Sequence, residues 1–382
     1  EVLKQGNLFT NSKTNCLWIA SYTQIRRHRS LLEKNKFRCA ILDEAQIIKN
    51  PQAKVTQACL AINAKNRLAL SGTPIENSAT DIWTIFRFLM PGLLGGKREL
   101  ENELSKDSLR THKLIQKQIS PFVIRRLKQQ VAKELPSKIE AEIPCILNLE
   151  QKKVYRLLAE QGILEYGNNL QEAVTNSPTH VFSLLTRLRQ SCCDLRLLPN
   201  SKETSEAGAK ESILLQKLKD LNTNGSKAII FSQFTGFLSI IEKSLKSEIP
   251  GLRTFKLTGS TRDRQEPVKL FQEANESSVM LASLKAAGLG VTLTAADYVF
   301  LMDPWWNPAV EEQAIDRAHR IGRKKPVFIY RFIAKGTVEE KVRLLQIEKK
   351  EIFEDILENN GNRNKVLDYF TSLEQLVELE SD

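Results

Sequence analysis

Short apolar segments that each run into a polar loop constrain the fold of this chain more than any other feature. They occur in two groups, one between residues 16 and 94 and one between residues 227 and 334, and helical periodicity follows them. Such segments are typical of parallel strands covered by helices on both faces, so the sequence predicts an α/β fold. The predicted strands are residues 16–20, 39–42 and 67–70 in the first group, and 228–231, 278–282, 298–302 and 327–332 in the second.

The sequence outside these groups is mainly helical in pattern. Asn148 followed by Gln151 is typical of a capping box and predicts a helix over residues 150–166. Thr337 followed by Glu340 predicts a second capping box, at the start of a helix that extends to residue 359. The predicted organisation is an α/β domain at 1–95, a helical region at 96–200, a small and polar linker at 201–212, a second α/β domain at 213–340 and a helical extension at 341–382.

The charge of the chain favours a polyanionic partner. Its 382 residues include 56 Lys and Arg against 45 Asp and Glu, which gives a formal net charge of +11. The apolar runs are too short to span a bilayer, so no membrane partner is expected. The six cysteines form no CxxC pair and lack nearby paired histidines, which predicts reduced thiols rather than a zinc site.

Two adjacent carboxylates follow the second predicted strand, in the sequence ILDEAQ at residues 41–46. Such a pair can divide the work of phosphoryl transfer. Asp43 would hold Mg²⁺ through water, and Glu44 would orient the water that attacks the γ-phosphate of ATP. An acidic turn after a strand is the alternative interpretation, and this segment alone does not decide between the two.

A second segment, RLALSGTPIEN at residues 67–77, runs from an apolar strand into small hydroxyl residues. Gly72 lets a backbone approach a phosphate or another domain, and Pro74 ends the extended run. An ordinary strand-to-turn transition is the favoured interpretation of this segment when it is taken alone.

Taken together, the DEAQ and SGTPIEN segments resemble motifs two and three of the SWI/SNF family of DNA-dependent ATPases, in helicase superfamily two. The resemblance continues through residues 17–27, 121–135, 185–193, 228–238 and, most densely, 281–323. It implies two RecA-like P-loop NTPase lobes, the first of them incomplete, with family-specific helical insertions. It also implies ATP and Mg²⁺ as cofactors and double-stranded DNA as a partner.

The resemblance assigns further roles near the nucleotide. Gln313, Arg317 and Arg320 stand at i, i+4 and i+7, so they are predicted to share one face of a helix. Gln313 would contact the nucleotide, and the two arginines would neutralise charge on the transferring phosphate, which contributes about 10³–10⁵ in rate. The residues implied in coupling by motif three are Ser71, Gly72 and Thr73.

The resemblance also implies contacts to the DNA backbone. The expected contact residues are Lys285, Gly288 and Gly290 in motif five, and Arg125 and Arg126 in the insertion. Trp305, Trp306 and His319 are expected to serve packing and structure rather than binding.

Several positions differ from the family pattern. Ala287 and Thr292 replace a Gly and an Asn of motif five, and Arg323 replaces the Gln that commonly ends motif six. Asp194 follows Cys193 where His-Pro is common in the family. The roles of these positions are left open by the sequence.

The phosphate-binding loop GxxxxGK[ST] is absent from the sequence. The nearest candidate, Gly95-Gly96-Lys97-Arg98, has Arg98 in place of the Ser or Thr that would bind Mg²⁺. We therefore expect a chain truncated upstream, or a decayed or split family member, which is inactive alone for lack of this loop.

Two functional hypotheses follow. The first is a monomeric ATP-dependent translocase that moves on duplex DNA and remodels DNA-bound proteins such as RNA polymerase. The second is a DNA-binding or regulatory remnant without ATPase activity. The wording and short spacing of the motifs favour a bacterial, nucleoid-associated cytoplasmic protein over a nuclear one.

Overall fold

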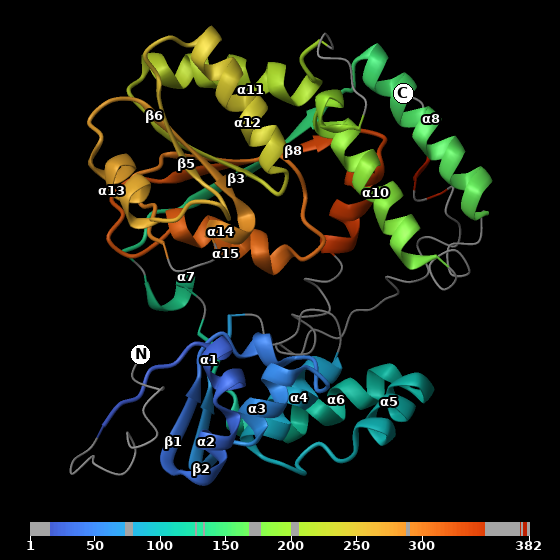
Figure 1. Ribbon diagram of the computed structural model, residues 1–382, viewed down its shortest axis with the longest axis vertical. Coiled ribbons are helices and arrows are strands. Elements are labelled where there is room, and N and C mark those ends of the chain that lie inside the picture. The colour runs from blue at the N-terminus through green and yellow to red at the C-terminus, as the bar shows by residue number, and fades with distance from the viewer. Residues whose placement is uncertain are drawn as a thin grey trace. The chain divides into compact units, whose positions relative to one another are not determined.

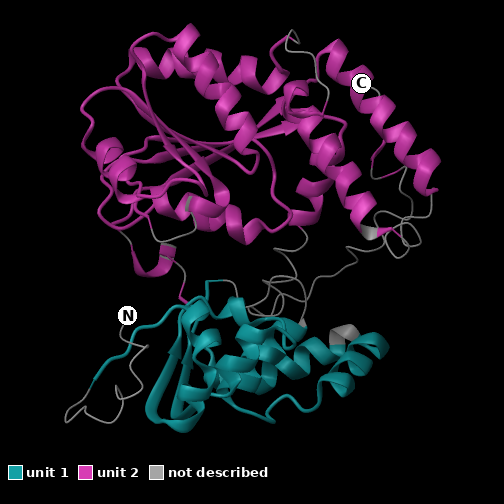
Figure 2. Ribbon diagram, in the orientation of Figure 1, with its two compact units in different colours: residues 1–125, 351–362 teal, residues 126–350, 363–382 magenta. Residues whose placement is uncertain are grey.

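The computed structural model describes residues 16–72, 79–126, 128–132, 134–167, 177–199, 206–287, 291–347, 375 and 377–379. The chain divides into two compact units, coloured separately in Figure 2. Unit 1 comprises Glu1–Arg125 and Glu351–Asn362, and unit 2 comprises Arg126–Lys350 and Arg363–Asp382. The division falls inside the region predicted as a helical insertion, and the finer domain boundaries stay predictions.

Unit 1 contains a parallel pair of strands, β1 (Lys36–Leu42) and β2 (Asn63–Ala69). They confirm the predicted strands at 39–42 and 67–70, although both begin earlier. The predicted strand at 16–20 is wrong, because these residues have no regular structure and Leu17 and Ile19 are 83% and 89% exposed. No described strand lies beside them, and an isolated segment lacks the hydrogen bonds that define a strand.

Helices cover one side of this pair of strands and form two clusters. The first cluster joins β1 to η2 (Ala45–Ile48), α3 (Lys54–Leu60) and α4 (Ala79–Leu89), through residues such as Leu42, Ile48 and Phe88. The second joins α4 to α5 (Lys97–Lys106) and α6 (Ser108–Ile119). The remaining elements of unit 1 are α1 (Tyr22–Arg27), α2 (Arg29–Lys34) and η3 (Ser120–Phe122).

Unit 2 is built on a six-stranded parallel sheet in the order β3-β8-β7-β4-β6-β5. The four predicted strands are confirmed as β4 (Lys227–Ser232), β6 (Ser278–Ser283), β7 (Tyr298–Leu301) and β8 (Val327–Ala334). Prediction missed β3 (Lys138–Cys145) and β5 (Arg253–Leu257). These are the two edge strands, whose polar and exposed residues lack the signal of a strand buried on both faces.

Alternate residues of the central strands face two separate cores. Ile230 of β4 faces α11 (Ala209–Thr223) and α12 (Thr235–Glu248). Phe231 faces α13 (Gln265–Glu273), α14 (Leu284–Ala287) and α15 (Pro308–Ala318). Figure 1 shows α11 and α12 on one side of the sheet and α14 and α15 on the other. This arrangement confirms the predicted α/β class.

A third cluster packs α8 (Leu149–Tyr166) against α10 (Pro178–Cys193). The capping box predicted for Asn148 and Gln151 is present at the start of α8. Unit 2 also contains two short elements, α7 (Lys128–Val131) and η4 (Leu195–Leu197). Helix α11 begins at Ala209, inside the segment predicted as a linker, of which 201–205 lie outside the described residues.

The predicted helix after Thr337 is present over residues 338–347, and its continuation lies outside the described residues. Its cap differs from the prediction. The Thr337 hydroxyl accepts from the Glu339 N–H at 3.2 Å, and the Glu340 carboxylate accepts from Gly336 rather than from Thr337. Among the helices of the described residues, none has the length and apolar character needed to cross a bilayer.

Candidate functional site

The two acidic residues of the DEAQ segment lie directly after β1. Asp43 is exposed, and Glu44 adopts φ 50° and ψ 51°. Within the described residues, Glu44 is the one non-glycine residue with a positive φ. A left-handed conformation costs an ordinary residue about 1–2 kcal/mol, and such strain is concentrated at functional sites.

A single amide connects the DEAQ segment to the SGT segment. The Gln46 Nε2 donates to the Glu44 Oε2 at 2.8 Å, and the Ser71 hydroxyl donates to the Gln46 Oε1 at 2.7 Å. Because a carboxylate only accepts, the orientation of the Gln46 amide is fixed by Glu44. The structure thus brings motifs two and three together as the resemblance implies.

The neighbouring residues of motif three are only partly described. Gly72 is exposed, and none of the described residues has an atom within 4 Å of where a Cβ would stand at this position. Thr73 lies outside the described residues, so its predicted coupling role stays a prediction.

The Asp43 carboxylate fits the expected magnesium ion. Its Oδ1 accepts from the Glu44 N–H at 3.0 Å, and within the described residues its other oxygen has no hydrogen-bond partner. A free and exposed carboxylate oxygen is a suitable ligand for Mg²⁺ or for a water that the ion carries. Glu44 stands beside it with a carboxylate held by Gln46.

Helix α15 carries the motif six residues. The Asn307 side chain caps its first turn by accepting from the Ala309 N–H at 3.0 Å, and Pro308 begins the helix. Gln313 and Arg317 are partly buried on this helix. The helix ends at Ala318, so the prediction that Arg320 shares its helical face is wrong.

The chain leaves the helix at His319, whose ring contacts another segment of unit 2. The His319 ring Nε2 bonds the Pro136 carbonyl at 2.7 Å, which supports the structural role expected for this histidine. The exposed Arg320 instead reaches motif five, where its Nη1 donates to the Thr292 Oγ1 at 3.2 Å. Thr292, which stands where the family has Asn, therefore accepts a hydrogen bond from Arg320, one of the predicted catalytic arginines.

A buried ionic network anchors the start of α15. The Glu311 carboxylate accepts from the Arg331 Nη1 at 2.6 Å, from the Trp305 N–H at 2.7 Å and from the Gln346 Nε2 at 2.6 Å. Burial raises the pKa of Glu311 above its ordinary value, and the charge of Arg331 opposes that rise. The network joins motif six to β8 and to the helical residues 338–347.

Arg323 has a structural role that the sequence left open. The residue is 8% exposed, and its guanidinium donates to the carbonyls of Thr294 at 2.8 Å, Lys325 at 2.6 Å, Pro326 at 2.8 Å and Ala296. Arg323 therefore fastens the end of motif five to the segment before β8.

The expected DNA-contact residues are placed only in part. Lys285 on α14 is exposed, and its Nζ lies 5.7 Å from the centroid of the Trp305 ring. Gly288 and Gly290 lie outside the described residues. Arg125 is partly buried and Arg126 is exposed, and they fall in different units. These DNA contacts stay predictions, while Trp305 packs on the core cluster beneath it as expected.

A basic face on α6 was not singled out by the sequence motifs. Arg110, Lys113 and Lys117 are exposed, and at i, i+3 and i+7 they lie along one side of the helix. The helix contains no acidic residue, and within the described residues these three cations have no ion-pair partner. The opposite side buries Ile115 and Ile119 and so fixes the cations toward solvent.

The sequence motifs also missed buried ion pairs that join distant segments within unit 2. The Lys210 Nζ lies 2.5 Å from the Glu339 Oε2, and both side chains are fully buried. Burial opposes the charge of Lys210, yet the adjacent Glu339 raises the pKa of this amine. Arg189 on α10 lies 3.9 Å from the buried Asp303. A long-range pairing of this kind leaves no local sequence pattern.

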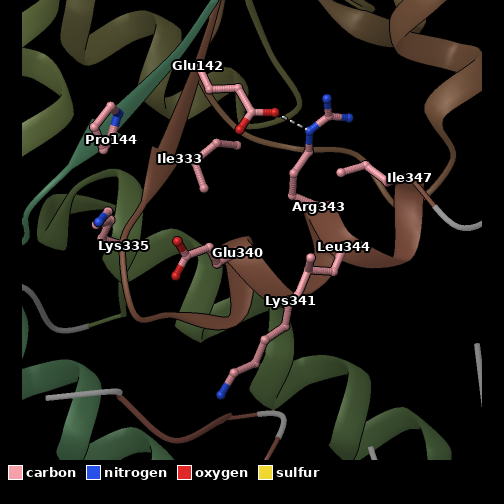
Figure 3. A pocket seen from close by; sticks show the side chains of 9 residues that line it. All are labelled: Glu142, Pro144, Ile333, Lys335, Glu340, Lys341, Arg343, Leu344 and Ile347. Atoms are coloured by element: carbon pink, nitrogen blue, oxygen red, sulfur yellow. Dashed lines mark hydrogen bonds and ion pairs between the residues drawn. The ribbon is translucent and has the colours of Figure 1, made fainter. Parts of the chain in front are cut away.

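A groove of about 490 Å³ lies in unit 2 beside the edge strand β3. Figure 3 shows Glu142 and Arg343 turned toward each other at this groove, where they form an ion pair of 2.6 Å. None of the predicted site residues lines it. Its lining is Glu142, Pro144, Ile333, Lys335, Glu340, Lys341, Arg343, Leu344 and Ile347.

Comparison with family models covers most of the chain. A model described as SNF2-related domain matches residues 4–197, and one described as helicase conserved C-terminal domain matches residues 209–322. The second match begins at the first residue of α11 and ends one residue before the end of motif six at Arg323.

Similar proteins include an uncharacterized ATP-dependent helicase of Mycoplasma pneumoniae, 36% identical over 98% of this chain and 35% of its own length. The TATA-binding protein-associated factor MOT1 of Saccharomyces cerevisiae is 33% identical over 92% of this chain and 22% of its own length. The chain thus spans about a third or less of these curated relatives.

A solved structure, the Sulfolobus solfataricus SWI2/SNF2 ATPase core in complex with dsDNA, is 29% identical to this chain. The match has a TM-score of 0.50 and covers 94% of this chain and 76% of that one. A second solved structure, of the Sulfolobus solfataricus SWI2/SNF2 ATPase core domain, matches with a TM-score of 0.51.

Proposed function

The chain belongs to the SNF2-related family, and we propose that it forms the core of a motor that couples ATP hydrolysis to movement along duplex DNA. The observation that carries the proposal is the Gln46 amide, which holds the Glu44 carboxylate at one end and Ser71 at the other. A carboxylate fixed beside an exposed aspartate suits the hydrolysis of a nucleotide.

The residues of the first unit would prepare the attacking water. Bound MgATP supplies the phosphoryl group and a cation that neutralises its developing charge. Asp43 would hold the ion through its free carboxylate oxygen, and Glu44 would orient the water. Gln46 would keep the Glu44 carboxylate in one position.

The second unit would supply positive charge. Arg317 and Arg320 would neutralise the transferring phosphate, and Gln313 would contact the nucleotide. Because these residues belong to unit 2 and Glu44 to unit 1, hydrolysis would require the two lobes to close on the same nucleotide. Release of Arg320 from Thr292 would be part of that closure.

Duplex DNA is the proposed partner. The net charge of +11 favours a polyanion, and Lys285 and the cations of α6 stand exposed. Contacts of this type bind phosphate without reading sequence, as a moving protein requires. The solved Sulfolobus relative is titled as a complex with dsDNA. We further propose that the motor acts as a monomer and remodels a DNA-bound protein such as RNA polymerase. Its proposed location is the bacterial cytoplasm.

A second candidate function is a DNA-binding or regulatory protein without ATP turnover. The absence of GxxxxGK[ST] from the 382 residues favours it for the chain taken alone. Reading the coding DNA upstream of Glu1 separates the two. An in-frame phosphate-binding loop supports the motor, whereas a stop codon followed by a new start supports the remnant.

The enzymatic test uses the protein as its gene encodes it and the 382-residue chain in parallel. The gene product should hydrolyse ATP faster when duplex DNA is added, and Glu44→Gln and Arg320→Ala should each remove that turnover. The 382-residue chain should bind DNA and hydrolyse no ATP. Intact turnover in Glu44→Gln would refute the role given to Glu44.

A further inference from the structure

Tyr22 lies on α1, before β1 in the chain, yet its hydroxyl donates to the Asp43 carbonyl at 2.6 Å. We propose that Tyr22 is a positioning residue for hydrolysis, whose hydroxyl holds the Asp43–Glu44 peptide so that Glu44 keeps its left-handed conformation. This inference rests on the proposed function, because it assigns Tyr22 a role only through Glu44.

Four hydrogen bonds fix the two peptides that flank the Glu44 Cα. On the first peptide, the Asp43 carbonyl accepts from Tyr22 at 2.6 Å and the Glu44 N–H donates to the Asp43 Oδ1 at 3.0 Å. On the second, the Glu44 carbonyl accepts from the Ile47 N–H at 3.0 Å and the Ala45 N–H donates to the Leu70 carbonyl at 2.8 Å. The orientation of these peptides sets φ and ψ of Glu44.

Of these four bonds, only the bond from Tyr22 is made by a side chain outside residues 43–47. The other partners are a neighbouring carboxylate and the backbone of the loop and of the residue after β2. A strained conformation persists only where its surroundings determine it. Loss of the Tyr22 hydroxyl would free the Asp43 carbonyl, and the first peptide could then rotate away from the strained orientation.

Tyr22 is itself held in place for this task. Ser21 and Gln24 form a capping box around the first turn of α1, and the Tyr22 ring packs against the core cluster that contains Leu42 and Ile48. A tyrosine hydroxyl has an ordinary pKa of about 10, so it is protonated at neutral pH and can donate to a carbonyl.

The test compares Tyr22→Phe with the matched control Tyr330→Phe, both in the protein as its gene encodes it. Each substitution removes one oxygen and keeps the ring. The Tyr330 hydroxyl has no hydrogen bond to the described residues, and its ring stacks on Phe300. Three quantities are measured: kcat and KM for ATP with duplex DNA, hydrogen exchange of the amides at residues 42–48 without nucleotide, and Tm.

We expect Tyr22→Phe to lower kcat about fivefold to tenfold while KM for ATP changes less than about twofold, because Glu44 acts on the chemical step. Amide exchange at 42–48 should accelerate in Tyr22→Phe and stay unchanged in Tyr330→Phe. A purely structural role would lower Tm and leave kcat of the folded protein unchanged.

An unchanged kcat in Tyr22→Phe, or unchanged exchange at 42–48, overturns the inference. An equal loss of kcat in Tyr330→Phe does so too. The Glu44→Gln variant distinguishes this failure from failure of the proposed function. If Glu44→Gln hydrolyses ATP normally, the role of Glu44 is wrong, and exchange at 42–48 alone then decides whether Tyr22 holds the loop.

Discussion

The hydroxyl of Ser71 donates to the side-chain oxygen of Gln46 at 2.7 Å, across the ends of two adjacent parallel strands. The same Gln46 amide donates to Glu44, so a change at Ser71 reaches the carboxylate proposed to orient water. Motif three therefore has a direct physical route to motif two.

This route predicts energetic coupling between Ser71 and Gln46. Ser71→Ala and Gln46→Ala should each lower kcat/KM for ATP, and the double variant should lose less than the sum of the two effects. The expected interaction free energy is about 1 kcal/mol, the usual contribution of one hydrogen bond. A double-mutant cycle of DNA-stimulated ATPase measures it, and strict additivity would show that the bond carries no coupling.

A second prediction concerns acid stability and the ion pairs of β3. Although burial alone would raise it, the pKa of Glu140 lies below its ordinary value because Lys138 and Arg331 hold its carboxylate. The distances to those two cations are 2.7 and 2.9 Å. A depressed folded-state pKa means that the stabilisation is complete above the unfolded pKa, about 4.3, and is lost as pH falls through the folded pKa.

Glu140→Gln should therefore lower Tm near pH 7 and flatten the fall of Tm between about pH 5 and pH 3. Glu160→Gln is the matched control, since Glu160 is exposed on α8 and has no ion-pair partner in the described residues. Thermal unfolding at a series of pH values is the measurement. Equal acid sensitivity in Glu140→Gln and the parent would contradict the prediction.

The basic face of α6 predicts a specific salt dependence of DNA binding. Its first and last cations are seven residues apart, or roughly 10 Å along the helix, which corresponds to about three phosphates at 3.4 Å each along one strand. Replacing Arg110, Lys113 and Lys117 by Gln should reduce the slope of log K against log salt by about 2 to 3.

The control for α6 replaces three other lysines by Gln and so changes the net charge equally. Lys97, Lys219 and Lys246 are suitable, because each already pairs with a glutamate, at 3.2, 2.8 and 2.9 Å. Fluorescence anisotropy with a labelled duplex at several salt concentrations gives both slopes. If the slope of log K against log salt falls equally in the two triple variants, α6 contributes only through net charge.

Sequence patterns predicted the parts of this molecule that are determined locally. The strands β4, β6 and β7 were found because both of their faces are buried, and the α8 cap was found because Asn148 and Gln151 meet within one turn. Edge strand β3 was missed because it carries charged side chains, such as Lys138 that pairs with Glu312 of α15, and so lacks an apolar sequence pattern. The site residues followed from a resemblance, not from periodicity.

Long-range contacts explain the remaining failures. Periodicity extended α15 to Arg320, but the helix ends at Ala318, and the His319 ring that follows bonds the distant Pro136 carbonyl. The contact between Tyr22 and Asp43 depends on tertiary packing that places α1 against α3, and no spacing in the sequence encodes it. The sequence showed that Arg323 departs from the family pattern of motif six, but its carbonyl partners are known only from the fold.

Those partners lead to a last prediction, for Arg323→Gln. Glutamine is shorter and neutral, so it cannot bond the Thr294 and Ala296 carbonyls and the Pro326 carbonyl at once. Buried or partly buried acceptors then lose their donor. The free energy of unfolding should fall by about 3 kcal/mol, within the range of a broken buried network. Arg262→Gln provides the control, because Arg262 is exposed and without an ion pair or hydrogen bond in the described part of the chain. Urea unfolding followed by circular dichroism measures both variants. A loss below about 0.5 kcal/mol in Arg323→Gln would show that solvent replaces these bonds and that the residue common in the family serves equally well.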